Sequence, residues 1–415
     1  ICNYLSSPFI NSESIKKIIQ AAVSQKVGVQ VDYHSIDLSI FPFIHARVDQ
    51  VTVSLPGKIE GRVETLDLFP EILPLFAGKV RISKIDLGSP DIDFTLPRNQ
   101  EKRKITKESL LLDKIKEIVV NVLYPLFAEL PEIQITIEDG TGNITEGDKI
   151  VFDFKDMEAE ISSLSKELEI NMKGSSGICD TISVKANLDR RDFKGNLVIQ
   201  LSLFQPQFLI DRFLPDAPCR ISQPIDKVSL HVKTDGPNEL KAEVEVSPFK
   251  LKVKKGDGES FLKGKKVKAS LYTGEVETKV TFHELNLEHP HINMKGDLIV
   301  DHETKQIRLK LTGRDIDIHS VREEALAFAG DNEEVRKIFQ VVNGGWVSDM
   351  VLTSQGKTLS DFGNMENLVI QGNFREGNIF IPGPDLVLEE VTGNFRAEQG
   401  ILKGTNISAK LEDAY

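Results

Sequence analysis

The residues most able to support chemistry are three histidines in the second half of the chain. His289 and His291 lie two positions apart, with His283 nearby. On a β-strand that spacing puts both imidazoles of the pair on one face, and imidazole nitrogens are good zinc ligands. Pro290 stands between them, and no further ligand follows at a recognisable spacing. We therefore do not expect a metal site at these histidines.

Two pairs of aspartates could supply the paired carboxylates of general acid–base catalysis. Asp91 and Asp93 alternate with apolar residues, and so do Asp315 and Asp317. That alternation is typical of the polar outer face of a half-buried strand. We interpret both pairs as strand surface rather than as a catalytic dyad.

The tripeptide Gly356-Lys357-Thr358 matches the end of a phosphate-binding loop, but the first glycine of that motif would fall at Val351. No GxGxxG motif follows a strand-like segment, and neither GxSxG nor HExxH occurs. The sequence therefore contains no catalytic constellation, and we expect a protein that is not an enzyme and needs no cofactor.

The acidic composition of the chain argues against two classes of binding partner. The 415 residues are 40% hydrophobic and 27% charged, with a formal net charge of -12. Such an acidic chain offers no basic field to offset phosphate repulsion, which argues against nucleic acid. It argues equally against broad electrostatic docking on an anionic membrane. Of the three cysteines, Cys179 and Cys219 could pair in an oxidising compartment or remain free thiols.

Helical periodicity is confined to a few segments. An amphipathic helix is predicted from Asn11 or Ser12 to about Gly28, where it would cover the first open edge of a sheet. Further amphipathic helices are predicted over about 109–130, over 206–214, and over 320–342 with a break near Gly330. These helices are natural plugs or rims for a groove, or simple packing elements.

From about residue 29 the apolar residues recur at every second position, which predicts on the order of twenty-five strands. Turn signals such as Asp139-Gly140 and Glu376-Gly377-Asn378 separate them and imply antiparallel connections. Because no linker-like segment divides the strands, a series of closed sandwiches is the weaker alternative. We predict a mainly β fold, a long, curled antiparallel β-sheet forming an open hydrophobic groove, with an N-terminal capping helix and a few inserted amphipathic helices.

The predicted organisation has five parts. These are an N-terminal region with the capping helix and first strands (1–100), a charged loop and amphipathic helix (101–131), the continuing groove (132–318), a helical insertion (319–346) and a C-terminal groove repeat (347–415).

Two segments resemble a known family. The region 12–96 runs from the amphipathic helix through Leu38, Phe41 and Pro42 to the stretch Leu68-Phe69-Pro70-Glu71-Ile72-Leu73-Pro74-Leu75-Phe76-Ala77-Gly78-Lys79-Val80. The region 367–404 has a cadence of strand, glycine, strand, Ile381-Pro382, strand and Val391-Thr392-Gly393. This order of parts resembles the AsmA-like family of bacterial envelope proteins and its larger TamB-like and YhdP-like relatives.

The resemblance implies a function. It implies a membrane anchor upstream of Ile1, localisation in the periplasm at the bacterial inner membrane, and a groove that conducts phospholipid acyl chains between the inner and outer membranes. Envelope proteins are then possible partners. A second hypothesis is a scaffold that assists outer-membrane protein assembly by pairing at a sheet edge.

Strand phase predicts which side chains would line such a groove. The predicted lining residues are Ile135, Phe152, Ile170, Val184, Ile199, Leu230, Val232, Val244, Leu251, Ala269, Val280, Leu309, Ile381 and Leu388.

Overall fold

The computed structural model describes residues 30–39, 43–55, 59–76, 81–96, 132–146, 149–192, 194–213, 220–235, 240–255, 258–274, 276–330, 332–358, 361, 364–399 and 401–411. Most of these residues lie in strands, so the fold is mainly β, as predicted. The chain divides into two compact units, with the boundary after Leu201.

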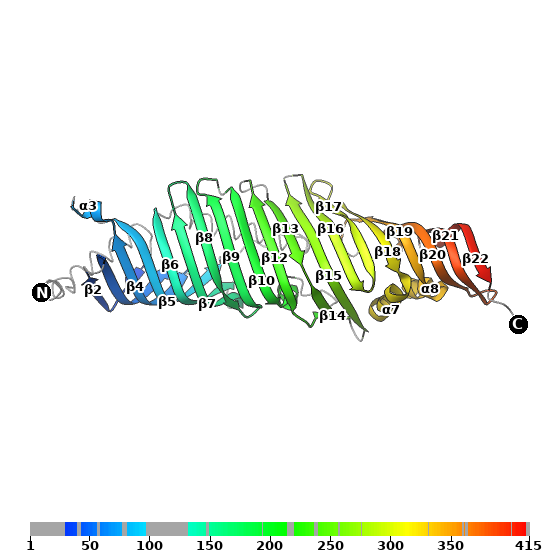
Figure 1. Ribbon diagram of the computed structural model, residues 1–415, viewed down its shortest axis with the longest axis horizontal. Helices are drawn as coiled ribbons and strands as arrows, with labels where there is room; N and C mark the ends of the chain where they lie inside the picture. The colour runs from blue at the N-terminus through cyan, green and yellow to red at the C-terminus, as the bar shows by residue number, and fades with distance from the viewer. Residues whose placement is uncertain are drawn as a thin grey trace. The chain divides into compact units, whose positions relative to one another are not determined.

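Unit 1 contains ten strands and one short helix among the described residues (Figure 1). They are β1 (Gln30–Asp32), β2 (Ser35–Ser39), β3 (His45–Leu55), β4 (Ile59–Pro70), α3 (Ile72–Phe76), β5 (Ile82–Leu96), β6 (Ile133–Glu146), β7 (Lys149–Ser163), β8 (Glu167–Ser176), β9 (Cys179–Asp189) and β10 (Gly195–Phe204). The last strand, β10, crosses the boundary after Leu201 and ends in unit 2.

The strands of unit 1 pair with their sequence neighbours in a single sheet. Both β1 and β2 pair with β3, and β3 to β9 then pair in order. The prediction of purely antiparallel pairing is wrong at one point, because β5 and β6 are parallel. Parallel neighbours require the chain between them to return to the end where β5 begins, and the connection 97–131 is long enough to do so.

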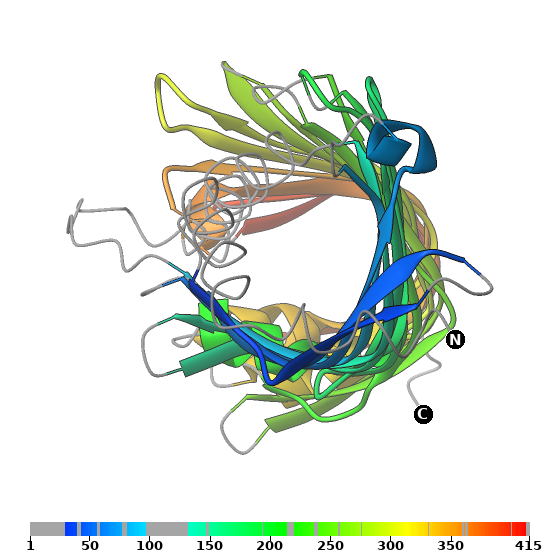
Figure 2. The ribbon, with the colours of Figure 1, turned by 90° about the vertical axis from the view of Figure 1, so that its left-hand side faces the viewer.

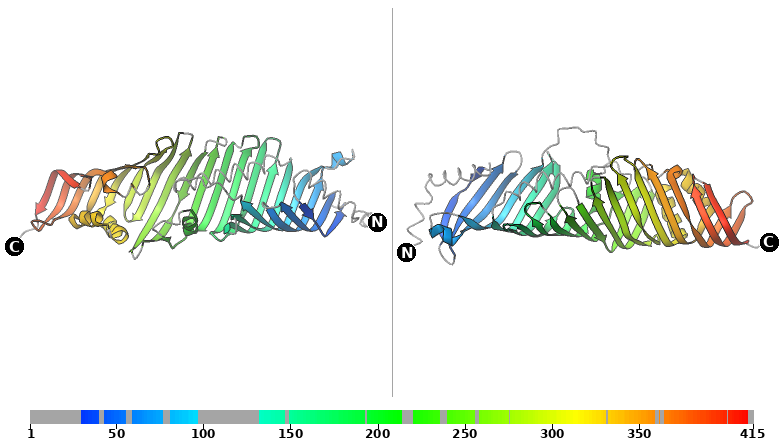
Figure 3. Two further views of the ribbon diagram at one scale, coloured as in Figure 1. Left: turned by 180° about the vertical axis from the view of Figure 1, so that it is seen from behind. Right: turned by 90° about the horizontal axis from the view of Figure 1, so that it is seen from above.

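Unit 2 is also a single layer of strands, with helices beside it (Figure 3). Its elements are α6 (Pro206–Phe213), β11 (Arg220–Ile221), β12 (Ile225–Thr234), β13 (Leu240–Val246), β14 (Phe249–Lys255), β15 (Gly258–Thr273), β16 (Glu277–His289), β17 (Ile292–Asp301), β18 (Ile307–Asp317), α7 (Ile318–Ala329), α8 (Glu333–Val341), β19 (Val342–Gly356), η3 (Met365–Asn367), β20 (Leu368–Ile381), β21 (Leu386–Glu398) and β22 (Ile401–Leu411).

The long strands are interrupted by aligned β-bulges. In unit 1, Ser89, Asp139 and Asp156 have positive φ at the same level of the adjacent strands β5, β6 and β7. In unit 2, Glu376 and Glu390 do the same in the neighbouring strands β20 and β21. A bulge bends its strand and increases the local twist, so aligned bulges crease a sheet. The strands of unit 1 accordingly follow an arc (Figure 2).

Two predicted turns are wrong for this reason. Asp139-Gly140 lies inside β6, and Glu376-Gly377-Asn378 lies inside β20. In both places a single residue with φ near +50° absorbs the local irregularity, and the strand continues in the same direction. The residue types that mark a turn also suit a bulge, because both need a left-handed backbone position.

The helices agree in part with the sequence analysis. The helix α6 lies at the predicted 206–214, and α7 and α8 occupy the predicted broken segment 320–342. The short helix α3 was not predicted. The expected capping helix before Gly28 and the helix over 109–130 lie outside the described residues.

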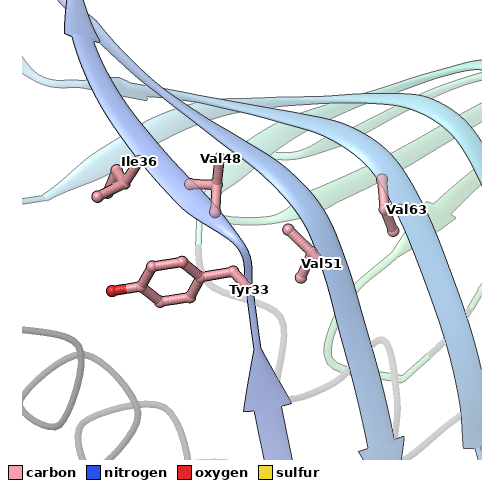
Figure 4. Close-up of a cluster of buried hydrophobic side chains, with 5 residues drawn as sticks. All are labelled: Tyr33, Ile36, Val48, Val51 and Val63. Atoms are coloured by element: carbon pink, nitrogen blue, oxygen red, sulfur yellow. The ribbon is translucent and has the colours of Figure 1, made fainter. Parts of the chain in front are cut away.

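One cluster of buried apolar side chains in unit 1 lies where the chain first enters the sheet. Tyr33, Ile36, Val48, Val51 and Val63 are at most 7% exposed and form one cluster. Their side chains lie on the same side of β2, β3 and β4 (Figure 4). These buried apolar residues therefore lie on one side of the sheet, and the candidate site lies on that side.

Candidate functional site

Unit 1 presents apolar side chains in continuous rows across its strands. One row joins seven strands through directly paired residues, namely Ala46, Leu68, Ile85, Ile135, Ile161, Ile170 and Ala186. The next row consists of Val48, Leu66, Leu87, Ile137, Ala159, Met172 and Val184. At about 4.8 Å between strands, a seven-strand row extends for roughly 29 Å. We call the side of each sheet that carries such rows the apolar face.

The opposite side of the same sheet is polar at every corresponding position. The row between the two apolar rows consists of Arg47, Asp67, Asp86, Thr136, Glu160, Asn171 and Lys185. The guanidinium of Arg47 donates two hydrogen bonds to the Asp67 carboxylate, at 2.8 and 2.6 Å. That bond keeps the pKa of Asp67 below its ordinary value, with a smaller contribution from the Arg47 charge. Side-chain alternation therefore gives the sheet one polar face and one apolar face.

Unit 2 contains a longer row of the same kind. Ten strands contribute Leu230, Val244, Ala269, Phe282, Gly296, Leu311, Leu352, Ile370, Ala397 and Leu402 as successive partners. Ten strands at about 4.8 Å correspond to roughly 43 Å. The row contains no charged residue.

The predicted lining residues can now be placed. In unit 1, Ile135, Ile170 and Val184 lie in the two rows, and Phe152 pairs with Ile144. In unit 2 the paired sets are Leu230 with Val244, Val232 with Ala242, Ala269 with Phe282, Leu251 with Leu262, Val280 with Leu298, Leu309 with Leu298, Ile381 with Leu386, and Leu388 with Ile379. Ile199 lies in β10.

These residues are not sealed inside a core. Of the fourteen, Ile381 is exposed and the other thirteen are partly buried. In a closed sandwich the inward residues of one sheet interdigitate with those of a second sheet and lose contact with water. Within each unit the described strands form one layer, and the alternative of tandem closed sandwiches is therefore wrong.

The helix α7 lies against the apolar face of unit 2. Its Glu324 carboxylate accepts hydrogen bonds from the Ser260 hydroxyl, the Phe261 amide (2.9 Å) and the His289 ring (2.8 Å). Ser260 pairs with Val253, and the next pair on the same side of the hairpin is Leu262 with Leu251. Glu324 therefore approaches the sheet from its apolar side. The sequence analysis missed Glu324, because its partners are 35 to 64 residues away.

Electrostatics favour the ionised form of Glu324. Partial burial acts to raise the pKa of this carboxyl, but the bonds from Ser260, His289 and Phe261 outweigh it and the pKa lies below its ordinary value. The adjoining bond from the His291 amide to the Ser320 hydroxyl, at 3.0 Å, ties the start of α7 to the same region. The helix is thus fastened to the sheet by polar contacts at an otherwise apolar surface.

The histidines do not converge. The ring of His289 bonds to Glu324, whereas the His291 ring meets Trp346 edge-on at 5.6 Å between centroids. His283 instead bonds to the Ser270 hydroxyl at 2.8 Å. In the described part of the chain no group of three or more histidine, cysteine, aspartate or glutamate side chains could hold a metal ion.

The aspartate pairs belong to the polar face. Asp93 accepts bonds from the Asn143 amide and side chain, at 3.1 and 2.8 Å, and Asp91 accepts one from Thr141 at 3.0 Å. Asp315 forms an ion pair with Arg375 at 2.8 Å, while Asp317 caps the first turn of α7. Each carboxylate therefore has a structural partner.

The remaining candidates are also explained locally. The Asp361 carboxylate accepts bonds from the Lys357 and Thr358 amides, at 2.6 and 2.8 Å, and these bonds keep its pKa below the ordinary value. The Lys357 and Thr358 amides are therefore already hydrogen-bonded within the turn that follows Gly356. Cys179 is a buried free thiol whose pKa is raised by burial, and Cys219 lies outside the described residues.

Comparison with known proteins adds no assignment. No family model matches the chain, and no curated protein matches it. Among the described helices, none is both long and apolar enough to cross a membrane. The candidate site therefore consists of the two apolar faces and the helix fastened to one of them.

Proposed function

We propose that this protein binds phospholipid acyl chains on its apolar faces and conducts them along the sheet as a bridge-type lipid transport protein of the bacterial periplasm. The observation that supports this most is the in-register apolar row, which crosses seven strands in unit 1 and ten in unit 2 and remains partly exposed. The resemblance of the sequence to AsmA-like proteins supports the envelope location, an inner-membrane anchor upstream of Ile1 and envelope protein partners.

The physical argument concerns the cost of moving a lipid through water. Transfer of each CH₂ group out of water is favourable by ~0.8 kcal/mol of free energy. Exposing a whole acyl chain to water at once is therefore prohibitively costly. A surface of aliphatic residues without strong specific contacts lowers that barrier along its length, and its uniformity avoids a deep minimum where a lipid would stop. No energy-coupling residues are needed for diffusion along such a face.

The direct test is native mass spectrometry of the protein purified from cells, with lipid extraction from the same sample. We expect several phospholipids per chain. A homogeneous lipid-free mass would contradict the proposal and favour the scaffold function.

A pair of matched variants sharpens this test. Ile170→Asp puts a carboxylate in the apolar row, whereas Asn171→Asp puts the same charge on the neighbouring residue of the polar face. We expect bound lipid to fall severalfold in the first variant and to stay unchanged in the second, because burying an unpaired charge among acyl chains is costly. Equal lipid content in both variants would argue against binding at the apolar face. The double change Ile199→Asp and Val244→Asp extends the test to a second region.

Pairing at a sheet edge is the second candidate, and one observation favours it. Every residue of β22 is exposed, and β22 pairs with β21. An exposed strand of eleven residues could accept a strand from another protein. Binding of partner proteins that survives Ile170→Asp would support this function over lipid conduction.

A further inference from the structure

A positively charged surface lies on the polar side of the hairpin formed by β14 and β15. The hairpin pairs Lys250 with Lys263, Lys252 with Phe261, and Lys254 with Glu259. The neighbouring strand β11 places Arg220 opposite Lys254. We call this surface the basic hairpin face; it consists of Arg220, Lys250, Lys252, Lys254, Lys263 and Lys265.

The carboxylates beside this surface are too few to neutralise it. Glu259 forms ion pairs with Lys252 (2.6 Å) and Lys254 (3.4 Å), and Glu288 with Lys263 (2.5 Å) and Lys265 (3.8 Å). Among the described residues, these two carboxylates pair with four of the six cations, and no described ion pair involves Arg220 or Lys250. The neighbouring lysines on β15 differ, because Lys266 and Lys268 have their own partners, Glu245 and Glu243, at 3.2 and 3.4 Å.

The arrangement works against the stability of the hairpin itself. Like charges directly opposite each other on paired strands are destabilising, and both the Lys250–Lys263 and the Arg220–Lys254 pairs are of this kind. Lys250 lies over the Phe261 ring, with its Nζ 4.9 Å from the centroid, which offsets only part of the repulsion. An external anion would relieve it.

The geometry points to an extended anionic surface rather than to a single small anion. Lys250, Lys252 and Lys254 stand at alternate positions of one strand, about 7 Å apart, and therefore offer separate charges instead of converging on one phosphate. A phospholipid layer supplies many separate phosphates across an extended surface, which matches this spacing.

We propose that the basic hairpin face docks unit 2 on an anionic phospholipid membrane surface. This inference rests on the proposed function for its choice of lipid as partner, but docking and acyl-chain binding occur on opposite sides of the sheet. The net charge of -12 does not prevent this docking, because salt at 0.1 M ionic strength screens charges that lie more than about 10 Å away. The membrane surface therefore responds mainly to the local excess of positive charge.

The test is co-flotation of the full chain with vesicles of phosphatidylcholine alone or with added phosphatidylglycerol. We expect binding only to the anionic vesicles, weakening as salt is added. Arg220→Gln combined with Lys250→Gln should reduce binding roughly 25-fold, because each basic residue near an anionic surface contributes about a fivefold factor. This variant removes one cation from each of the two like-charge pairs and breaks no described ion pair, so its thermal midpoint should not fall.

The matched control is Lys266→Gln combined with Lys268→Gln, which removes two charges from β15 that have their own carboxylate partners. It should lose much less binding. Equal losses in the two double variants, equal binding to neutral vesicles, or full competition by inorganic phosphate at constant ionic strength would overturn the proposal. Lipid extraction separates the two ideas, since the Arg220/Lys250 variant should retain co-purified lipid even where flotation is lost.

Discussion

At the scale of single residues, three serines interrupt the apolar faces and differ in their surroundings. Ser163, Ser260 and Ser354 are 1%, 5% and 5% exposed. The Ser260 hydroxyl bonds to Glu324, whereas the Ser163 and Ser354 hydroxyl oxygens have no hydrogen-bond partner within the described structure. A buried hydroxyl without a partner costs free energy that an alanine would not.

We therefore expect Ser354→Ala and Ser163→Ala to raise the free energy of unfolding by up to about 1 kcal/mol. Ser260→Ala should lower it by about 1 kcal/mol or more, because a donor to a carboxylate is lost. Urea denaturation followed by circular dichroism measures all three. If Ser163→Ala and Ser354→Ala destabilise as much as Ser260→Ala, their hydroxyls have partners that this explanation omits.

At the scale of elements, α7 is held on the apolar face by a charged group. The Glu324 side chain is 16% exposed and bonds to β15 and β16. Since the folded pKa of Glu324 is lowered, its contribution to stability is present above the unfolded value of about 4.3 and is lost as pH falls through the folded value. Acid should therefore loosen α7.

The prediction is a pH-dependent difference between the native chain and Glu324→Gln. Near neutral pH the variant should lose about 1–3 kcal/mol of unfolding free energy, because charge-assisted bonds become neutral ones. The difference should shrink as the pH falls through the lowered pKa of the folded carboxyl, because the native group is then protonated as well. Denaturation curves at several pH values check this, and a difference that grows toward acid would contradict it. Glu323→Gln, on an exposed position of the same helix, is the control.

At the scale of the whole molecule, two units each built from one layer of strands bury less apolar surface per residue than a two-layer domain. The denaturant dependence of unfolding, the m-value, follows the surface exposed on unfolding. We expect an m-value below that of two-layer proteins of 415 residues, and more than one unfolding transition. A single steep transition in urea would show cooperativity that this architecture does not explain.

Much of the local structure was predictable because side-chain alternation has a strict period of two. The phase of Ile133, Ile135 and Ile137, for example, is the phase in which β6 pairs with β7. The parallel pairing of β5 with β6 was not predictable from that alternation, since both pairing directions keep the same phase. The bulges at Asp139 and Glu376 were mistaken for turns because only the register on the next strand distinguishes the two.

By itself, the sequence determined that this protein is a mainly β chain whose strands each have one apolar side. It also indicated α6, α7 and α8, although not the short helix α3. Only the tertiary structure decided which apolar residues stand beside one another in continuous rows, that Glu324 meets Ser260 and His289, and that lysines from two strands gather with Arg220. The reason is physical: alternation is a property of one strand, whereas register, bulges and cross-strand charge are properties of pairs of strands.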